Sequence, residues 1–523
     1  MRARRLIWLA VLPLLAAGFV GFRGRGEAQF EIGIWYWHSP FRVSEDEART
    51  LRSCGVGRIY VRAATFRARE DGAEPILPQS WKSGGRGIPV VLCFNFEPAL
   101  ARGLERASLD RLSADLLTGV QKGISDARSA GADIAGVQFD ADCPTRLVGR
   151  YAELLSRFRS LLDRSSGTRA RLELSATMLP TWLGTPGADQ LARVVDVCVP
   201  QFYENRPFKT LADFKPVGDP AELERGLRKA ARLPGEFLVG LPVYGHAVLF
   251  DGSGKIAGMY RRLSAGEALR HPGLAAVETY PSDRVGKPAS RESYVGEDVL
   301  IVRAPNADSS GQGMGFAIAY SLPTPEILRA PLRLLRADRP ANCRGIALFR
   351  FPEPGESTCL SLDSLSAALR GRKAELVAKG RLIPGAAEPS AFSVSGKGRE
   401  VRAELSLEGS ASTFACPGAV SVLILFDQVG IEEALAGDFD FVRVGLWDAE
   451  TRKLVPASGM RSNAVLLERG HAAGGQRLRS GSITHSGGAT RARIEWRALG
   501  PGGFESLSGA SGLELRVPGG ARK

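Results

Sequence analysis

The sequence predicts an α/β protein built on a (β/α)8 TIM-like barrel, with an insertion between strands 7 and 8 and a C-terminal all-β sandwich-like domain. Short runs rich in β-branched and aromatic residues alternate with longer amphipathic runs, as in βα units around a parallel sheet. From about residue 374 the pattern changes to short runs of alternating apolar and polar residues between Gly, Ser and Asp turns. That second pattern is typical of a β-sandwich.

Eight runs have the length and composition of barrel strands, and eight is the number that closes a barrel of this kind. They are residues 30–37, 58–63, 88–95, 134–140, 171–177, 195–203, 237–244 and 344–351. Apolar residues at helical spacing predict helices at about 107–129, 145–164, 219–232, 324–336 and 361–371.

The connection between the last two of these strands is unusually long. At roughly 90 residues it exceeds a plain loop, so we expect an insertion over about 250–340 with strands of its own at 300–304 and 315–323. The predicted domains are a signal peptide over 1–28, the barrel over 30–373 and an accessory β-sandwich over 374–523.

The N-terminus has the pattern of a secretory signal peptide. Basic residues flank the apolar run 6–22, and Gly26-Glu27-Ala28 offers a small-x-small cleavage site. We therefore expect an exported protein, periplasmic or secreted. The alternative is an uncleaved membrane anchor, because about 17 apolar residues is near the lower limit for a span.

Charge, cysteine content and motif spacing limit the partners, disulfides and cofactors that the sequence predicts. The net charge of +13 is compatible with contact to anionic envelope polymers or membrane surfaces. Because the basic residues are scattered and no nucleic-acid motif is present, we interpret the charge as a general surface property. We therefore expect no nucleic-acid partner. Seven cysteines without a CxxC pair do not form a disulfide framework, although pairing of Cys343 with Cys359 stays open. No cofactor is expected, and no metal-ligand spacing such as HExxH occurs.

The stretch VQFDADCP, residues 137–144, carries two carboxylates in an apolar run. If it ends a barrel strand, the period of two places Gln138, Asp140 and Asp142 on the inner face and the apolar residues against the helices. The C-terminal ends of barrel strands form the mouth where barrel enzymes keep their active sites. The two aspartates are therefore predicted to line that mouth.

Polar and aromatic residues end the other predicted strands as well, and they should converge on the same rim. They are Trp35, Tyr36, Trp37, His38, Asn95, Glu97, Ser175, Thr177, Gln201, Tyr203, Glu204, Tyr244, His246, Arg350 and Glu353. Carboxylates beside aromatic rings suit the cleavage of sugars, because an acid protonates the glycosidic oxygen while rings stack on sugar faces. A carboxylate close to another also has its pKa raised, as a general acid requires.

Three motifs in order resemble those of chitinase-type glycoside hydrolases of family eighteen. AGVQFDAD (135–142), QFYEN (201–205) and GLPVYGH (240–246) correspond to DxxDxDxE, Met/Gln-x-Tyr-Asp/Asn and G-x-P-x-Y-G. More closely, residues 138–144, 151–155, 174–183 and 348–352 resemble the bacterial barrel family called domain of unknown function 3142. This resemblance covers roughly residues 30–370.

The resemblance implies roles for individual residues. Asp142 falls on the chitinase family's catalytic Glu and would be the general acid, Asp140 would orient it, and Tyr203 would steady an acetamido group or an intermediate. Ala135 and Gln138 replace the first two Asp positions of the motif. The predicted substrate contacts are Trp35, Trp37, Asn95, Glu97, Gln138, Gln201, Tyr244, His246 and Arg350.

Two functions follow as alternatives. One is an exported glycoside hydrolase-like barrel that cleaves a cell-envelope or extracellular polysaccharide. The other is a non-catalytic carbohydrate-binding or envelope-assembly protein, which the missing Glu and the two replaced Asp positions favour. Structural alternatives also stand: an Asp140–Asp142 pair bonded to Asn95 or the next helix, or core packing of the tryptophans. For Arg350 the alternative is a barrel ion pair.

Overall fold

The computed structural model describes much of the chain from Phe30 onward. The described residues are 30–70, 72–166, 171–203, 208–215, 217–260, 276–280, 299–303, 316–321, 323, 326–353, 356, 358–371, 376–384, 399–409, 413, 419–450, 453–457, 461–470, 472, 475–486, 489–499 and 506–514. The predicted signal peptide over 1–28 lies outside them. Within the described ranges, no helix has the length and apolar character needed to cross a bilayer.

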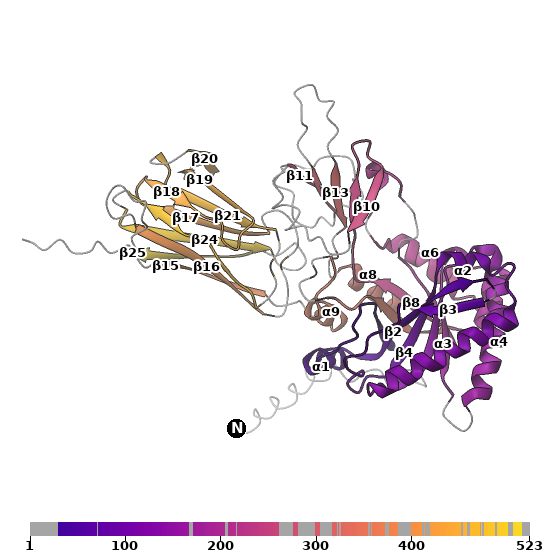
Figure 1. The fold of residues 1–523 in the computed structure, drawn as a ribbon. Coiled ribbons are helices and arrows are strands. Elements are labelled where there is room, and N and C mark those ends of the chain that lie inside the picture. The colour runs from indigo at the N-terminus through magenta and orange to yellow at the C-terminus, as the bar shows by residue number, and fades with distance from the viewer. Residues whose placement is uncertain are drawn as a thin grey trace, which may run out of the picture.

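Eight parallel strands form a closed barrel, which confirms the predicted fold class (Figure 1). They are β1 (Glu31–Tyr36), β2 (Val56–Arg69), β4 (Val90–Phe96), β5 (Ile134–Asp140), β6 (Glu173–Met178), β7 (Val197–Pro200), β8 (Glu236–Pro242) and β14 (Cys343–Phe349). The order is β1-β14-β8-β7-β6-β5-β4-β2, and β1 pairs with β2 to close the ring. Each strand coincides with one of the eight runs predicted from the sequence.

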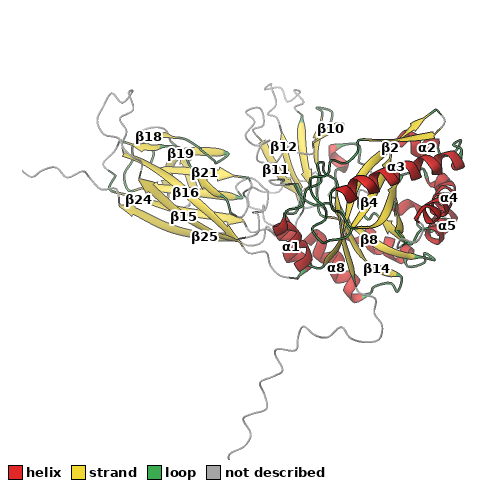
Figure 2. Ribbon diagram, turned by 60° about the horizontal axis from the view of Figure 1, so that its bottom comes forward, coloured by secondary structure: helices red, strands yellow, loops and turns green. Residues whose placement is uncertain are grey.

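Helices lie outside the strands (Figure 2). They are α1 (Glu45–Ser53), α2 (Pro98–Gly103), α3 (Leu109–Ser129), α4 (Val148–Ser166), α5 (Pro186–Val194), α6 (Pro220–Ala230), α8 (Glu326–Ala337) and α9 (Leu362–Leu369). Single 3-10 turns occur at Thr145–Leu147, Pro180–Trp182 and Leu211–Asp213. The apolar stripe of α4 packs on β5, where the rings of Phe158 and Phe139 meet edge to face at 4.9 Å.

The second strand extends beyond the predicted run 58–63. β2 continues to Arg69 and pairs antiparallel with β3 (Gly72–Ile76), which lies outside the ring of parallel strands. Arg67 and Arg69 on this extension both pair with Glu74 of β3. A hairpin therefore follows the barrel part of the strand, outside the eight runs predicted from the sequence.

A separate five-stranded antiparallel sheet lies in the chain between β8 and β14. Its strands, in spatial order, are β10 (Ile256–Tyr260), β9 (Ala247–Phe250), β13 (Ala317–Ser321), β12 (Val299–Arg303) and β11 (Ala276–Tyr280). Phe214, Val248, Phe250 and Ala319 form a small core on it. The predicted insertion thus has strands of its own, including both runs identified from the sequence.

The C-terminal region consists of two antiparallel sheets with one shared core. One contains β15 (Leu376–Pro384), β16 (Arg399–Gly409), β23 (Ile483–His485) and β18 (Ile431–Ala434), with β22 (Arg477–Arg479) also paired to β16. The other runs β20 (Lys453–Pro456), β19 (Phe441–Asp448), β21 (Ala464–Arg469), β17 (Val420–Phe426), β24 (Arg491–Leu499) and β25 (Ser506–Glu514). Buried residues of both sheets, such as Leu405 and Ile424, form the core of a sandwich.

Candidate active site

A packed polar layer fills the barrel interior below its C-terminal mouth. Gln138 of β5 is fully buried, and its side-chain oxygen accepts a hydrogen bond from Trp35 Nε1 at 2.7 Å. Its amide nitrogen donates to Ser175 Oγ at 3.2 Å, and Cys93 Sγ lies 3.2 Å from the same Gln138 oxygen. Trp35 is 1% exposed. Gln138 and Trp35, both predicted to contact substrate, are therefore buried beneath the mouth, and neither ring face of Trp35 is open to solvent.

Asp140 lies one layer higher, at the last residue of β5. Thr177 Oγ1 donates a hydrogen bond to Asp140 Oδ1 at 2.6 Å. Enclosure by the barrel raises the pKa of Asp140 above its usual value, and hydrogen bonds from the side chains of Thr177 and Gln201 oppose this without cancelling it. Asp140 thus holds its proton to a higher pH than an exposed aspartate. Asn95 lies beside it in register but accepts its own hydrogen bond from Thr65 Oγ1, at 2.9 Å.

Asp142 occupies a different environment from Asp140. β5 ends at Asp140, so the strand alternation that would place both on one face stops there. Asp142 is exposed and its φ is +36°, a left-handed backbone conformation that few non-glycine residues adopt. Its neighbours Ala141 and Cys143 are buried on the helix side. Strained conformations of this kind cluster at functional sites, so Asp142 stays a candidate for chemistry.

An aromatic cluster forms around Phe349, the last residue of β14. The Phe349 ring stacks on Tyr203 with centroids 5.6 Å apart and an 18° angle between the planes. Tyr244 and Trp37 meet it edge to face at 5.3 and 5.5 Å. The cluster brings together three predicted site residues that follow the ends of β1, β7 and β8. Phe349 was not among the site residues predicted from the sequence. An apolar residue inside a predicted strand cannot be distinguished by sequence from a residue of the hydrophobic core.

Two charge pairs follow β14 at the same end of the barrel. Arg350 donates from both terminal nitrogens to the Glu356 carboxylate, at 3.1 and 2.5 Å, which is the ion pair considered as the alternative role of Arg350. His38 Nδ1 lies 2.7 Å from Glu353 Oε1, and its Nε2 lies 2.7 Å from the carbonyl oxygen of Phe351. Burial lowers the pKa of His38. Glu356 stands in a loop after the strand, and no sequence motif marks it as a partner of Arg350.

The remaining predicted residues lie around this rim. Glu97 is partly exposed and precedes α2 without a side-chain capping bond. The backbone of Gln201 forms an isolated parallel β-bridge with Gly240 of β8. His246 is 8% exposed, with its ring 5.8 Å from that of Tyr244, directly before the insertion sheet. In the part of the chain that the structure describes, no group of three His, Cys, Asp or Glu side chains is arranged to hold a metal ion.

Residues 97–264 match the family described as Domain of unknown function (DUF3142). That span includes Asp140, Asp142, Tyr203, Tyr244 and His246, so it confirms the resemblance over these residues. No curated protein matches the chain.

The chain has low similarity to several solved structures. A chitinase from Chromobacterium violaceum ATCC 12472 has a TM-score of 0.42 and 14% identity, covering 65% of this chain and 98% of its own. The spore cortex-lytic enzyme SleL of Bacillus megaterium QM B1551 has a TM-score of 0.42 and 11% identity, covering 66% and 75%. A glycoside hydrolase family 18 N-acetylglucosaminidase from Paenibacillus barengoltzii has 0.40 and 13%, covering 65% and 100%. Similarity at this level assigns no role to any residue here, and the barrel is defined by its own strand pairing.

Proposed function

We propose that this protein is a glycoside hydrolase-like enzyme whose site is the C-terminal mouth of the barrel. The observation that carries the proposal is the raised pKa of Asp140 in a mouth that also presents the Phe349 cluster. Gln201 joins the two features, because its side chain bonds Asp140 while Tyr203, two residues later, stacks on Phe349. A carboxyl group that keeps its proton and aromatic rings for sugar faces are the parts that glycosidic cleavage needs.

Asp142 is the proposed general acid and Asp140 its partner. Asp142 is exposed at the rim, so a glycosidic oxygen can approach it, whereas Asp140 is only partly exposed one layer below. In the proposed step Asp142 gives a proton to the leaving oxygen as the glycosidic bond breaks. Asp140 orients Asp142, and Tyr203 steadies the sugar or an intermediate. Water then adds to the sugar and restores the proton.

The proposed substrate is a polysaccharide of the cell envelope or of the extracellular space. The support is the basic flank, apolar run and cleavage pattern of the N-terminus, together with the net charge of +13. Export, and membrane attachment through an uncleaved apolar segment, belong to this proposal.

The test is a hydrolysis screen of the full chain against a panel of polysaccharides, read as new reducing ends. Asp142→Asn should lower the rate by about 10²–10⁴-fold and leave binding intact, since general acids contribute that much. Asp126→Asn, on the exposed face of α3, is the matched control and should change nothing. An Asp142→Asn rate equal to that of the unchanged protein would refute the role of Asp142.

A non-catalytic carbohydrate-binding protein is the second candidate. It is favoured by Gln138, which stands at an acidic position of the chitinase motif and is fully engaged with Trp35 and Ser175. If this candidate is right, polysaccharides bind at the mouth without any product being formed.

A further inference from the structure

The outward face of the β15–β16–β22 sheet carries an ordered group of basic residues. Along β16 the residues Val401, Ala403, Leu405 and Leu407 are buried in the sandwich core, so the residues between them face outward. The strand register sets their neighbours. Glu404 lies between Arg381 of β15 and Arg479 of β22, and Ser406 lies between Lys379 and Arg477. We call Lys379, Arg381, Arg477 and Arg479, with Glu404 and Ser406 between them, the basic patch.

Glu404 fixes the arginines of the basic patch. Arg381 donates from Nε at 2.8 Å and from Nη2 at 2.7 Å to Glu404 Oε1, and Arg479 Nε donates to Oε2 at 2.9 Å. Arg477 Nε lies 3.8 Å from the same carboxylate. The Glu404 side chain is 2% exposed, whereas the three arginine side chains are 57–63% exposed. Each guanidinium thus uses its inner edge on Glu404 and presents further N–H donors to the outside.

The charges of this face do not cancel. Among its described residues, Glu404 and Glu408 oppose the four basic side chains, with Lys379 Nζ 2.7 Å from Glu408. The next outward pair, Arg402 and Glu400, is neutral, with 3.0 Å between its charged groups. Asp438, on the far side of β22, accepts the backbone N–H of Arg479. Four cations at neighbouring positions of a sheet repel each other, so an anion that docks between them is stabilised.

We propose that the basic patch binds an anionic polysaccharide, whose carboxylate or sulfate groups dock on the outward guanidinium donors beside Ser406. The described outward positions of these rows carry no aromatic side chain. Single-stranded nucleic acids are usually held by stacking on such rings, so a sugar polymer fits the patch better. The proposal does not require the barrel to be catalytic. Its consequence is attachment of the protein to a charged polymer through the C-terminal sandwich.

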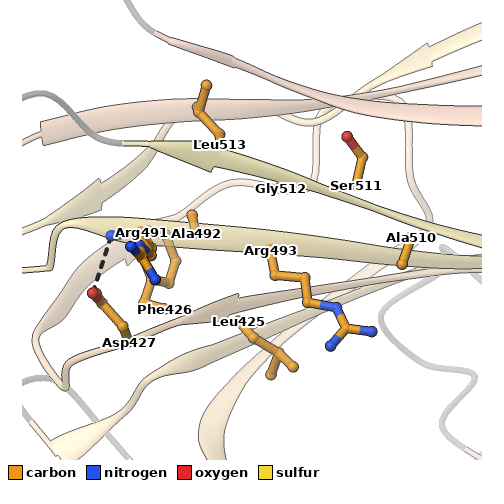
Figure 3. Close-up of a pocket in the computed structure, with 10 residues that line it drawn as sticks. All are labelled: Leu425, Phe426, Asp427, Arg491, Ala492, Arg493, Ala510, Ser511, Gly512 and Leu513. Carbon is orange, nitrogen blue, oxygen red and sulfur yellow. Dashed lines mark hydrogen bonds between the residues drawn. The ribbon is translucent and has the colours of Figure 1, made fainter.

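The opposite sheet offers a matched control. There β17, β24 and β25 line a hollow of about 610 Å³ that includes Arg491 and Arg493 (Figure 3). The Arg493 side chain lies 3.1 Å from Glu495 of the same strand, and Asp427 accepts backbone N–H groups of Thr490 and Arg491. These two arginines are as exposed as those of the basic patch but are not gathered around a shared carboxylate.

The experiment compares Lys379→Gln/Arg477→Gln with Arg491→Gln/Arg493→Gln in the full chain. The first variant leaves Arg381, Glu404 and Arg479 in place, so the sandwich should stay folded, as thermal unfolding would verify. Binding is measured by calorimetry to polygalacturonate, dextran sulfate and neutral dextran at several salt concentrations. The patch variant should bind the acidic polymer at least tenfold more weakly, with a salt dependence smaller by about two ionic contacts. The control variant should bind like the unchanged protein.

Comparison of polygalacturonate with dextran sulfate identifies the preferred anionic group. The proposal is overturned if the unchanged protein binds neither acidic polymer, or binds neutral dextran equally well. It is also overturned if the control variant loses as much affinity as the patch variant. Tighter binding of single-stranded DNA than of either polymer would identify a nucleic-acid surface instead.

Discussion

Acidic side chains at the two ends of the barrel have different partners: charged ones at one end and neutral ones at the other. At the N-terminal end of the strands, Glu31, Arg58, Glu173 and Arg344 form a closed ring of alternating charge. Arg58 Nε lies 3.1 Å from Glu31 and Arg344 lies 2.6 Å from it, while Glu173 contacts both arginines. Each charge therefore has two partners of opposite sign. At the C-terminal end, Asp140 is held by neutral donors from Thr177 and Gln201, and enclosure raises its pKa.

This difference separates a stabilising end from a reactive one. A carboxylate between two guanidinium groups has a charged partner on each side, so removal of one member breaks charge-assisted contacts. Enclosure favours the protonated, neutral form of a carboxyl group. Loss of that proton destabilises the folded protein, but a carboxyl group that holds its proton is suited to acid catalysis. The following substitutions test that comparison.

Asp140→Asn should have the largest effect, and activity and stability should change in opposite directions. Hydrolysis should fall by about 10²–10⁴-fold if Asp140 takes part in acid catalysis. The raised pKa means that the folded protein binds this proton more tightly than the unfolded chain. The free energy of unfolding therefore falls as pH rises from the ordinary range of aspartate through the raised pKa. Asparagine cannot ionise, so the variant should be the more stable protein above that range.

Urea unfolding across pH 3–8, read by fluorescence, measures this effect. Asp126→Asn serves as the control because Asp126 is exposed on α3 and pairs with Lys122. Equal pH dependence in Asp140→Asn and the unchanged protein would show that Asp140 is not the group that titrates.

Glu173→Gln should destabilise the opposite end of the barrel without affecting the chemistry. The substitution leaves Arg58 and Arg344 with Glu31 as their shared partner inside the ring. Breaking a largely buried ion pair typically costs about 3 kcal/mol, so the free energy of unfolding should fall by about that much. Lys122→Gln breaks an exposed pair and should cost less than about 0.5 kcal/mol. Similar costs for both variants would mean that the ring is no more important than a surface contact.

Phe349→Ala should have the smallest effect of the three and should act on binding. Its ring contacts Tyr203, Tyr244 and Trp37, so its loss removes a stacking surface and loosens the cluster. The dissociation constant of a bound glycan should rise about tenfold, in line with the contribution of aromatic contacts. Phe349→Tyr keeps the ring and should bind normally. Isothermal titration below the unfolding temperature measures both, and equal affinities would exclude Phe349 from the site.

The sequence predicted the scaffold of this site better than its contacts. The eight strands follow from local composition and period, and the apolar residues Val137 and Phe139 fix which side of β5 faces the helices. The sequence predicted Asp142 on the inner face beside Asp140, but the end of the strand before Asp142 and its positive φ leave no compositional mark. Phe349 and Glu356 were missed for a related reason. The ring partners of Phe349 come from distant parts of the chain, and Glu356 stands in a loop, so only the folded arrangement identifies these contacts.

The charge ring also has a consequence for how the barrel assembles during synthesis. Glu31 and Arg344 are separated by 313 positions, and β1 pairs with β14 as well as with β2. Until residue 344 has left the ribosome, the ring holds two carboxylates and one guanidinium, and the edge of β1 that pairs with β14 is open. The insertion sheet must also be made before β14 can enter. The last strand therefore closes the barrel and completes the charge ring in one late step of synthesis.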